Sequence, residues 1–275
     1  MTRNCPIGVF DSGSGGLTIL KEFLEVLPDY DYIYLGDHAR APYGTRSFEI
    51  VYEYTLQAVK WFFDQGCELV IIACNTASAK ALRTIQQKDL EHITKTGRVL
   101  GVIRPTTEII GSKTKTNNIG IFATTGTVAS QSYILELEHL WPNIIAHQQA
   151  CPMWVPLIEN NEHLDPGADY FVQKYIDLLL EQEASIDTIL LACTHYPLLS
   201  HKIKERLPAH IQVFDQGEIV AKSLVNYLER HPTIEQKIST GRSVTFYTTE
   251  HAERFNEKAA LFFGKNIQSK NLERL

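Results

Sequence analysis

The feature that most constrains the fold of this chain is a regular alternation of two kinds of segment. Short apolar runs, rich in β-branched and aromatic residues as buried strands are, alternate with amphipathic stretches long enough to form helices. The predicted strands are 7–10, 32–35, 69–73, 99–103, 119–123, 188–192 and 211–214. The predicted helices are 17–26, 47–65, 77–87, 128–140 and 168–183.

This βαβα order predicts an α/β protein with mostly parallel sheets, because parallel strands need crossover helices that cover both faces of a sheet. Ligand sites in such proteins collect at the carboxyl ends of the strands. The residues that directly follow each apolar run are therefore the first candidates for chemistry.

Two of the predicted strands have similar sequences. Glu68-Leu-Val-Ile-Ile-Ala-Cys74-Asn-Thr resembles Asp187-Thr-Ile-Leu-Leu-Ala-Cys193-Thr-His, since each has an acidic residue, an apolar strand, Ala, Cys and a polar pair. The two cysteines lie about one α/β domain apart in the sequence. We therefore predict two similar three-layer αβα domains whose strand ends face each other across a central cleft.

Composition limits the possible partners of the chain. Its 275 residues, 44% of them hydrophobic, suffice for a large core and approach the size at which chains divide into domains. A net charge of −6 argues against a nucleic acid as main partner, because phosphate binding requires a basic face. No apolar run has the length of a membrane span, and no signal peptide is expected. We predict that the basic stretch from Lys258 to Arg274 is a solvated terminal helix.

The five cysteines bear on the cellular location. They are odd in number, widely spaced and without a CxxC pair, which favours reduced thiols in a cytoplasmic protein over a disulfide framework. Most free cysteines are small buried hydrophobes, and we expect this of Cys5, Cys67 and Cys151. Cys74 and Cys193 differ, because each begins a polar segment at the carboxyl end of a predicted strand. The nearby helix start would favour the reactive thiolate there.

Two thiols in one cleft are compatible with several kinds of chemistry. A metal site is one, but Cys193 and His195 belong to no compact set of four ligands. A cysteine hydrolase would leave the second thiol unexplained, and a redox pair usually has CxxC spacing. Racemisation uses two such groups directly: one base removes the α-proton from one face of the substrate, and an acid returns a proton to the other face. Asp11, after the first strand, could then modulate Cys74, and His195 could hold or relay the proton of Cys193.

Further polar groups at the strand ends would suit the carboxylates of an amino acid, with help from helix-start N–H groups. They are Ser12, Asn75, Thr76, Thr124, Thr127 and Thr194. Tyr43 and Gly44 mark a turn in Ala41-Pro42-Tyr43-Gly44. The glycine-rich segment after Ser12 lacks both the P-loop Lys-Ser/Thr and the spaced glycines of a dinucleotide site, so it only weakly indicates a nucleotide.

Four segments resemble the glutamate racemases, in the order in which that family has them. They are Ile7-Gly-Val-Phe-Asp11-Ser12-Gly-Ser-Gly-Gly-Leu17, Tyr34-Leu-Gly-Asp37-His-Ala-Arg-Ala-Pro42-Tyr43-Gly44, Cys74-Asn75-Thr76-Ala77 and Cys193-Thr194-His195-Tyr196-Pro197-Leu198-Leu199. The segment from Cys151 to Glu159 is similar as well, and the resemblance spans nearly the whole chain. His38 stands where the family more often has a small polar residue, and we expect this change to be tolerated.

The resemblance implies interconversion of L- and D-glutamate for peptidoglycan synthesis, with no pyridoxal phosphate, metal or other cofactor. It implies that Cys74 and Cys193 exchange the proton and that Asp11 and His195 assist them. It also implies the following substrate contacts: Asp11, Ser12, Pro42, Tyr43, Gly44, Asn75, Thr76, Thr124, Thr127, Glu159, Thr194 and His195.

The resemblance further implies a homodimer and a particular division of the chain. The first domain would hold residues 1–98 together with a returning segment, 211–275, and the second would hold residues 99–210. Two alternatives remain open. One is a racemase of the same superfamily that acts on aspartate or another amino acid, and the other is a non-catalytic module that binds an amino acid in the same cleft.

Overall fold

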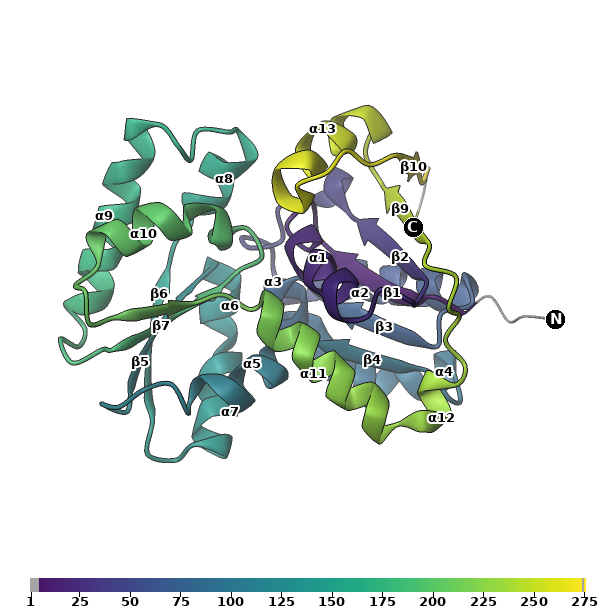
Figure 1. Ribbon diagram of the computed structural model, residues 1–275, viewed down its shortest axis with the longest axis horizontal. Helices are drawn as coiled ribbons and strands as arrows, with labels where there is room; N and C mark the ends of the chain where they lie inside the picture. Colours follow the sequence, from purple (N-terminus) through teal and green to yellow (C-terminus); the bar gives the residue numbers. More distant parts are fainter. Residues whose placement is uncertain (1–4, 274) are drawn as a thin grey trace.

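The computed structural model describes residues 5–273 and 275, and has two parallel sheets side by side (Figure 1). Every strand pair within the described ranges is parallel. The first sheet has the order β10-β9-β2-β1-β3-β4, from β1 (Ile7–Asp11), β2 (Tyr32–Gly36), β3 (Leu69–Ile72), β4 (Arg98–Gly101), β9 (Val244–Thr248) and β10 (Ser269–Asn271). The second has the order β6-β5-β7-β8, from β5 (Asn118–Ala123), β6 (Ile145–Ala150), β7 (Thr188–Ala192) and β8 (Gln212–Phe214).

Helices connect the strands and cover both faces of each sheet, as parallel pairing requires. Around the first sheet lie α1 (Leu17–Val26), α2 (Phe48–Asp64), α3 (Asn75–Ala77), α4 (Leu90–Ile93), α11 (Gly217–Arg230), α12 (Pro232–Glu235) and α13 (Ala252–Phe263). Around the second lie α5 (Ile103–Ile110), α6 (Thr125–Ser130), α7 (Ser132–Leu140), α8 (Trp154–Glu159), α9 (Pro166–Leu180) and α10 (Ser200–Arg206). Shorter helical turns are η1 (His38–Arg40), η2 (Ser78–Leu82), η3 (Ile85–Asp89) and η4 (Tyr196–Leu199).

The alternation of side chains along the central strands explains the layers. Ile7 and Val9 of β1 pack on the face covered by α1, α11 and α13, whereas Phe10 packs with α2 on the opposite face. Ile121 of β5 packs against α5 and α7, and its neighbour Phe122 packs against Trp154 of α8. Strands buried on both faces appear in the sequence as continuous apolar runs, which is why these strands were predictable. The α/β class with mostly parallel sheets is confirmed.

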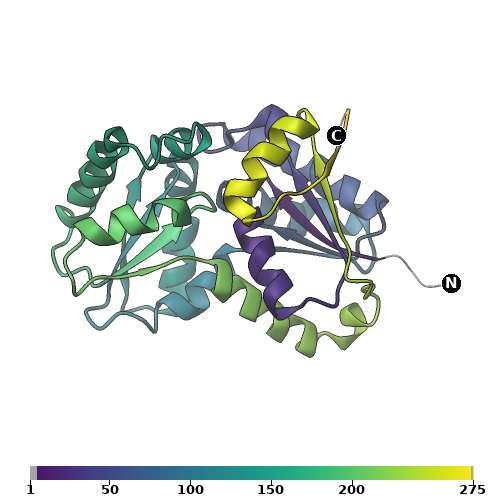
Figure 2. The same cartoon turned by 45° about the horizontal axis from the view of Figure 1, so that its top comes forward.

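The end of the chain returns to the first sheet. After β8 the chain enters α11, which packs beside α1, and then adds β9 and β10 to the edge next to β2. Figure 2 shows α13, in yellow, next to α1, in purple, on the side that faces the second sheet. The C-terminal helix of the first sheet therefore lies close to the boundary between the two halves.

Several predicted elements need correction. The strand predicted at 99–103 ends at Gly101, because α5 begins at Ile103. The helix predicted at 128–140 is divided at Gln131, which has left-handed backbone angles. The strands β6, β9 and β10 were not predicted.

The predicted terminal helix from Lys258 to Arg274 is wrong in both position and exposure. α13 begins at Ala252 and ends at Phe263, where Gly264 takes up the left-handed conformation that closes a helix (φ 75°). Ile267 is then buried and β10 follows. Residues 1–4, and residue 274 of this terminal segment, lie outside the described residues.

The division at 98/99 and 210/211 stays a prediction, but strand pairing places its limits a few residues later. The end of β4, expected in the second domain, pairs with β3 of the first sheet. β8, expected in the first domain, pairs with β7 of the second sheet. Among residues 5–273 and 275, no helix is both long and apolar enough to cross a membrane.

Candidate active site

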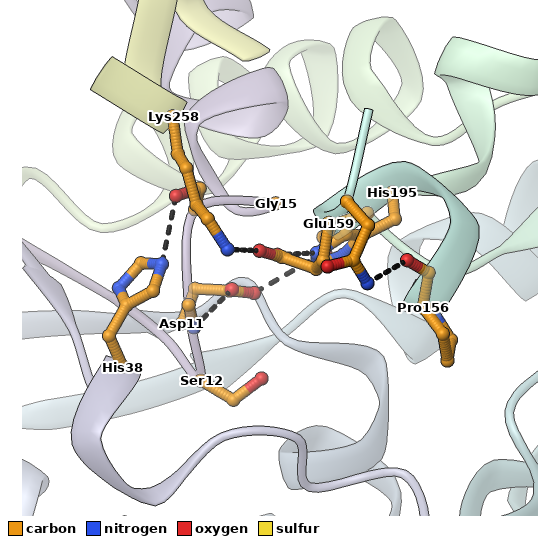
Figure 3. Close-up of polar contacts among 12 residues, drawn as sticks. Asp11, Ser12, Gly15, His38, Pro156, Glu159, His195 and Lys258 are labelled. Atoms are coloured by element: carbon orange, nitrogen blue, oxygen red, sulfur yellow. Dashed lines mark hydrogen bonds and ion pairs between the residues drawn. The ribbon is translucent and has the colours of Figure 1, made fainter. Parts of the chain in front are cut away.

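A cavity of about 380 Å³ lies where the carboxyl ends of the two sheets meet. This is where ligands bind in open parallel sheets, and here two such edges enclose one space. It is lined by Ser12, Gly13, His38, Ala41, Pro42, Tyr43, Gly44, Thr45, Cys74, Asn75, Thr76, Thr124, Thr125, Cys151, Pro152, Val155, Pro156, Glu159, Asn160, Cys193, Thr194, His195 and Lys258. Figure 3 shows the polar contacts on one side of it.

The structure brings nearly all of the predicted site residues to this cavity. Asp11 and Thr127 are the exceptions, because they lie one layer behind the wall and support residues that line it. The expected core cysteines Cys5 and Cys67 are buried away from the cavity. Cys151 is also buried, but it lines part of the cavity, and burial raises the pKa of its thiol well above the usual value.

Cys74 follows β3 and precedes the first turn of α3. Its side chain is nearly buried, with 6% exposed, and its Sγ lies 3.4 Å from the Oγ of Ser12. Burial and, after it, the nearby carboxyl group of Asp11 raise the pKa of the Cys74 thiol to about 12, although the Ser12 hydroxyl acts in the opposite direction. Near neutral pH, Cys74 is therefore a protonated thiol.

Cys193 follows β7 at the matching position of the second sheet and is 7% exposed. Its neighbour His195 is almost completely buried. Burial alone would lower the pKa of the imidazole, but hydrogen bonds to Cys193 and Glu159 outweigh it and raise this pKa to about 10. His195 is therefore an imidazolium at neutral pH, and this cation lies next to the sulfur of Cys193.

Glu159, the last residue of α8, receives two cations on its two oxygen atoms. The Nε2 of His195 lies 2.6 Å from Oε1, and the Nζ of Lys258 lies 2.6 Å from Oε2. Burial raises the pKa of this carboxyl group, but the two cations lower it to about 2. Figure 3 shows Lys258 reaching down from α13 to this carboxylate.

Asp11 is the last residue of β1 and is fully buried. Its Oδ2 accepts a hydrogen bond from the backbone N–H of Gly13 at 2.8 Å, and its Oδ1 accepts one from the hydroxyl of Thr194 at 3.4 Å. Burial raises the pKa of the Asp11 carboxyl group, although His195 partly opposes this. Asp11 thus lies between the two thiol segments, and Gly15 lets them approach, because a Cβ there would meet the hydroxyl oxygen of Thr194 at 2.3 Å.

Three threonines connect the two halves at the cavity wall. The hydroxyl of Thr76, in the first half, lies 2.9 Å from that of Thr124, in the second. Thr124 also caps α6 by accepting the backbone N–H of Thr127 at 3.2 Å, and its hydroxyl donates to that of Thr127 at 3.1 Å. Hydroxyl groups and the start of a helix therefore meet here, which suits a carboxylate.

The side chain of Asn75 is held by a buried network rather than free to turn into the cavity. Its Nδ2 donates to Gln216 at 2.6 Å, and its Oδ1 accepts from Tyr133 at 2.6 Å. Gln216 also donates to Tyr133 at 2.7 Å and to Thr106 at 2.9 Å, both in the second half. This network therefore holds the start of the helix after Cys74 in place against the second half.

Pro42, Tyr43 and Gly44 form a loop over the cavity, and the Ala41–Pro42 peptide bond is cis. The Tyr43 hydroxyl donates to the buried carboxylate of Asp37, and the carbonyl of Gly44 accepts the N–H of Gly126 in the second half at 2.7 Å. The loop is thus tied to both halves of the molecule.

His38 and Lys258 line the cavity, although sequence analysis assigned a role to neither. The Nε2 of His38 lies 2.9 Å from the Oγ of Ser14, and burial lowers the pKa of this imidazole to about 4, so it is neutral. The only signal at His38 was its departure from the family pattern. Lys258 gave no signal, because a lysine in an amphipathic helix is typical of a solvent-facing position.

Comparisons with known proteins agree with this architecture. The family model described as Asp/Glu/Hydantoin racemase matches residues 10–224. A glutamate racemase of Ruegeria sp. (strain TM1040) is 38% identical over 271 residues, which are 95% of this chain and 97% of the relative. The crystal structure of a Bacillus anthracis glutamate racemase isoform has a TM-score of 0.88 at 30% identity, with 98% of each chain covered. The Francisella tularensis glutamate racemase, solved in complex with D-glutamate, has a TM-score of 0.86 at 30% identity, again with 98% coverage of both.

Proposed function

The chain belongs to the Asp/Glu/Hydantoin racemase family, among its glutamate racemases, and we propose that it interconverts L- and D-glutamate with Cys74 and Cys193 as the two proton-exchanging groups. One observation carries this proposal. The two thiols lie at the carboxyl ends of β3 and β7, in different sheets, and line one cavity. A substrate carbon between them would have one thiol on each face.

The proposed reaction moves one proton off the α-carbon and another onto it. The thiolate of one cysteine removes the α-proton, so that a C–H bond breaks and an S–H bond forms. The carbon becomes planar, and the thiol of the other cysteine then donates its proton to the opposite face. The reverse reaction exchanges the two roles. Because the two thiols carry both protons, the proposal assigns no step to a cofactor.

The protonation states of the resting site suit this reaction. One group must start as an acid and the other as a base. We propose that Cys74, whose raised pKa keeps its proton in place, starts as the acid, and that Cys193, which lies next to the imidazolium of His195, starts as the base. Removal of an α-proton by Cys193 and donation by Cys74 thus convert one enantiomer into the other. They leave Cys193 as the thiol and Cys74 as the thiolate, so water must return a proton to Cys74 and take one from Cys193 before the next turnover in the same direction.

For the substrate, we propose that its carboxylates bind to the wall of hydroxyls and helix starts. Ser12, Thr76 and Thr124 line the cavity with their neighbours at the strand ends, and Tyr43 and Gly44 close it from the loop. Glutamate, rather than aspartate, is supported by the names of the full-length relatives and by the D-glutamate complex of the Francisella structure.

Proton exchange in D2O tests the function. L-glutamate and L-aspartate are incubated separately with the protein, a chelator and no added cofactor, and the α-hydrogen signal is followed by NMR together with circular dichroism. We expect glutamate alone to lose both its α-hydrogen signal and its optical activity. Exchange of aspartate alone would favour the related racemase, and binding of glutamate without exchange would favour a non-catalytic module.

Three broader features also stay proposals. We propose that the enzyme acts in the cytoplasm, where its five cysteines remain reduced, and that it supplies D-glutamate for peptidoglycan. We also propose that it forms a homodimer, as the family resemblance implies. Light scattering coupled to size exclusion, and D-glutamate auxotrophy on depletion in the native cell, test these features.

A further inference from the structure

One carboxylate in the cavity connects elements from both halves of the molecule. Glu159 ends α8 of the second half, and Lys258 belongs to α13 of the first half. The Nζ of Lys258 lies 2.6 Å from Oε2 of Glu159, and the other oxygen, Oε1, lies 2.6 Å from Nε2 of His195. A continuous chain of contacts therefore runs from α13 through Glu159 and His195 to Cys193.

This arrangement differs from a surface ion pair, which contributes little because water competes with both partners. The side chain of Glu159 is 22% exposed, that of His195 is 8% exposed and that of Lys258 is 40% exposed. Lys258 therefore lies on the solvent side of the Glu159–His195 pair, which is otherwise largely shielded from water. Other charged or titratable groups that interact with this cluster are Cys193, the buried Asp11 and Tyr34, and the neutral His38.

A second contact restricts the Glu159 side chain. It is the last residue of a short helix, and the next turn contains Asn161 with left-handed backbone angles (φ 58°). A glutamate side chain has three rotatable bonds, so holding it against His195 costs conformational entropy. A cation on the opposite oxygen leaves the carboxylate only one arrangement that satisfies both neighbours.

The rest of α13 supports this placement. The ring of Phe262 lies 5.0 Å from that of His195, and the ring of Phe255 lies 5.1 Å from that of His38, both edge-on. Lys258 lies between these two aromatic anchors in the sequence of one helix. Its position relative to the cavity is therefore fixed by packing.

We propose that Lys258 is a positioning residue: from α13 it holds the Glu159 carboxylate against His195, and it thereby supports proton exchange at Cys193 but not at Cys74. Only the effect on proton exchange at Cys193 rests on the proposed racemase function. The effect of Lys258 on His195 is independent of what the enzyme acts on.

Activity of variants tests the catalytic part. We expect Lys258→Met to lower kcat for glutamate about 10-fold to 100-fold, as small displacements of catalytic groups do, and to change KM less than 3-fold. Lys258→Arg, which can still donate to Oε2, should recover most of the loss. Lys265→Met, an exposed residue in the turn after the same helix, is the matched control and should retain wild-type activity.

A double mutant identifies the route of the effect. If Lys258 acts through Glu159, the loss caused by Lys258→Met should largely disappear in a Glu159→Gln background, because coupled residues are not additive. Multiplication of the two losses would overturn the proposal.

Isotope effects with α-deuterated L- and D-glutamate show which of the two thiols Lys258 affects. The enantiomer whose isotope effect increases in Lys258→Met should be the one whose isotope effect increases in Cys193→Ser. An increase for the other enantiomer would overturn the assignment to Cys193.

A direct measurement separates this inference from the proposed function. The imidazole of His195 is titrated by NMR in histidine-labelled protein without substrate. Loss of the positive charge of Lys258 by itself would raise the midpoint, whereas displacement of Glu159 would lower it. We expect a lower midpoint in Lys258→Met, a similar shift in Glu159→Gln, and recovery in Lys258→Arg. An unchanged or higher midpoint would overturn the positioning role even in an active racemase, and a lower midpoint in a protein that does not racemise glutamate would uphold it while refuting the proposed function.

Discussion

Cys74 and Cys193 occupy matching positions but have different surroundings. Both follow a central parallel strand, and both are nearly buried. Around Cys74 the neighbours are a hydroxyl group, from Ser12, and the buried carboxyl group of Asp11. Around Cys193 they are an imidazolium and, behind it, a carboxylate that a lysine holds.

The difference separates what the fold supplies from what individual side chains supply. Two similar α/β halves place two sulfur atoms at equivalent strand ends, which is a symmetric arrangement. A racemase, however, must begin each turnover with one acid and one base. Burial and the nearby Asp11 keep the proton of Cys74 in place, whereas Cys193 lies next to a cation. The different neighbours of the two thiols thus allow a symmetric fold to begin the reaction with one acid and one base.

The largest expected effect comes from removing either thiol. Cys74→Ser and Cys193→Ser should each lower kcat/KM for glutamate about 10²-fold to 10⁴-fold, because a hydroxyl is a far weaker base than a thiolate. The loss should have the same size in both directions, since each direction uses both groups and the two enantiomers have equal free energies. Circular dichroism from both enantiomers measures this, with calorimetric binding of glutamate as the control for folding. Full activity in either variant would refute the two-thiol mechanism.

The next largest effect should concern only the proton transfer at Cys193. His195→Gln removes the cation next to Cys193 and leaves Ser12, the hydrogen-bond partner of Cys74, unchanged, so we expect kcat to fall about 10²-fold. Isotope effects with α-deuterated glutamate should then increase for one enantiomer only, the same one as in Cys193→Ser. Equal increases for both enantiomers would contradict the assignment of His195 to one thiol.

The same histidine should make folding stability depend on pH. The pKa of His195 is about 10 in the folded protein and near 6.5 when unfolded, so the folded state binds an additional proton between these values. Its contribution to the free energy of unfolding is therefore complete below pH 6.5 and is lost as the pH rises through 10. Urea unfolding of wild type and His195→Gln at pH 6, 8 and 10 measures it. We expect the difference between the two proteins to shrink with pH, and a constant difference would contradict the raised pKa.

How far the sequence predicts this fold depends on where each strand lies in its sheet. The central strands β1, β3, β5 and β7 are buried on both faces and therefore appear as continuous apolar runs. β6 is an edge strand with the sequence Ile-Ala-His-Gln-Gln-Ala, in which Ile145 is 60% exposed. β9 and β10 likewise close one edge of the first sheet. A strand that buries only part of its surface lacks the pattern by which buried strands are detected.

The residues of the candidate site also divide into those that a local sequence pattern predicts and those that it does not. Residues at strand ends, such as Cys74, Cys193 and Asp11, follow from the rule that parallel sheets bind ligands at their carboxyl edges. Glu159 was expected only from the family resemblance, because it lies on a helix with no local signal. Lys258 was expected to be solvated, since nothing in a local pattern shows that the last helix returns to the other half of the cavity. Contacts made across long sequence separations are the part that local reasoning does not reach.

The smallest expected effect concerns the reactivity of the Cys74 thiol. Because burial, and after it Asp11, raises the pKa of Cys74 to about 12, its alkylation by iodoacetamide should accelerate about 10-fold per pH unit from pH 7 to 10, without a plateau. Asp11→Asn removes one cause and should increase the rate at pH 8 by about 3-fold to 10-fold, since a pKa decrease of one unit gives ten times more thiolate. Mass spectrometry of the Cys74 peptide measures the rate, and the buried Cys67 in the same digest is the control. A plateau below pH 9 in wild type, or a slower reaction in Asp11→Asn, would show that the two thiols are more alike than their neighbours indicate.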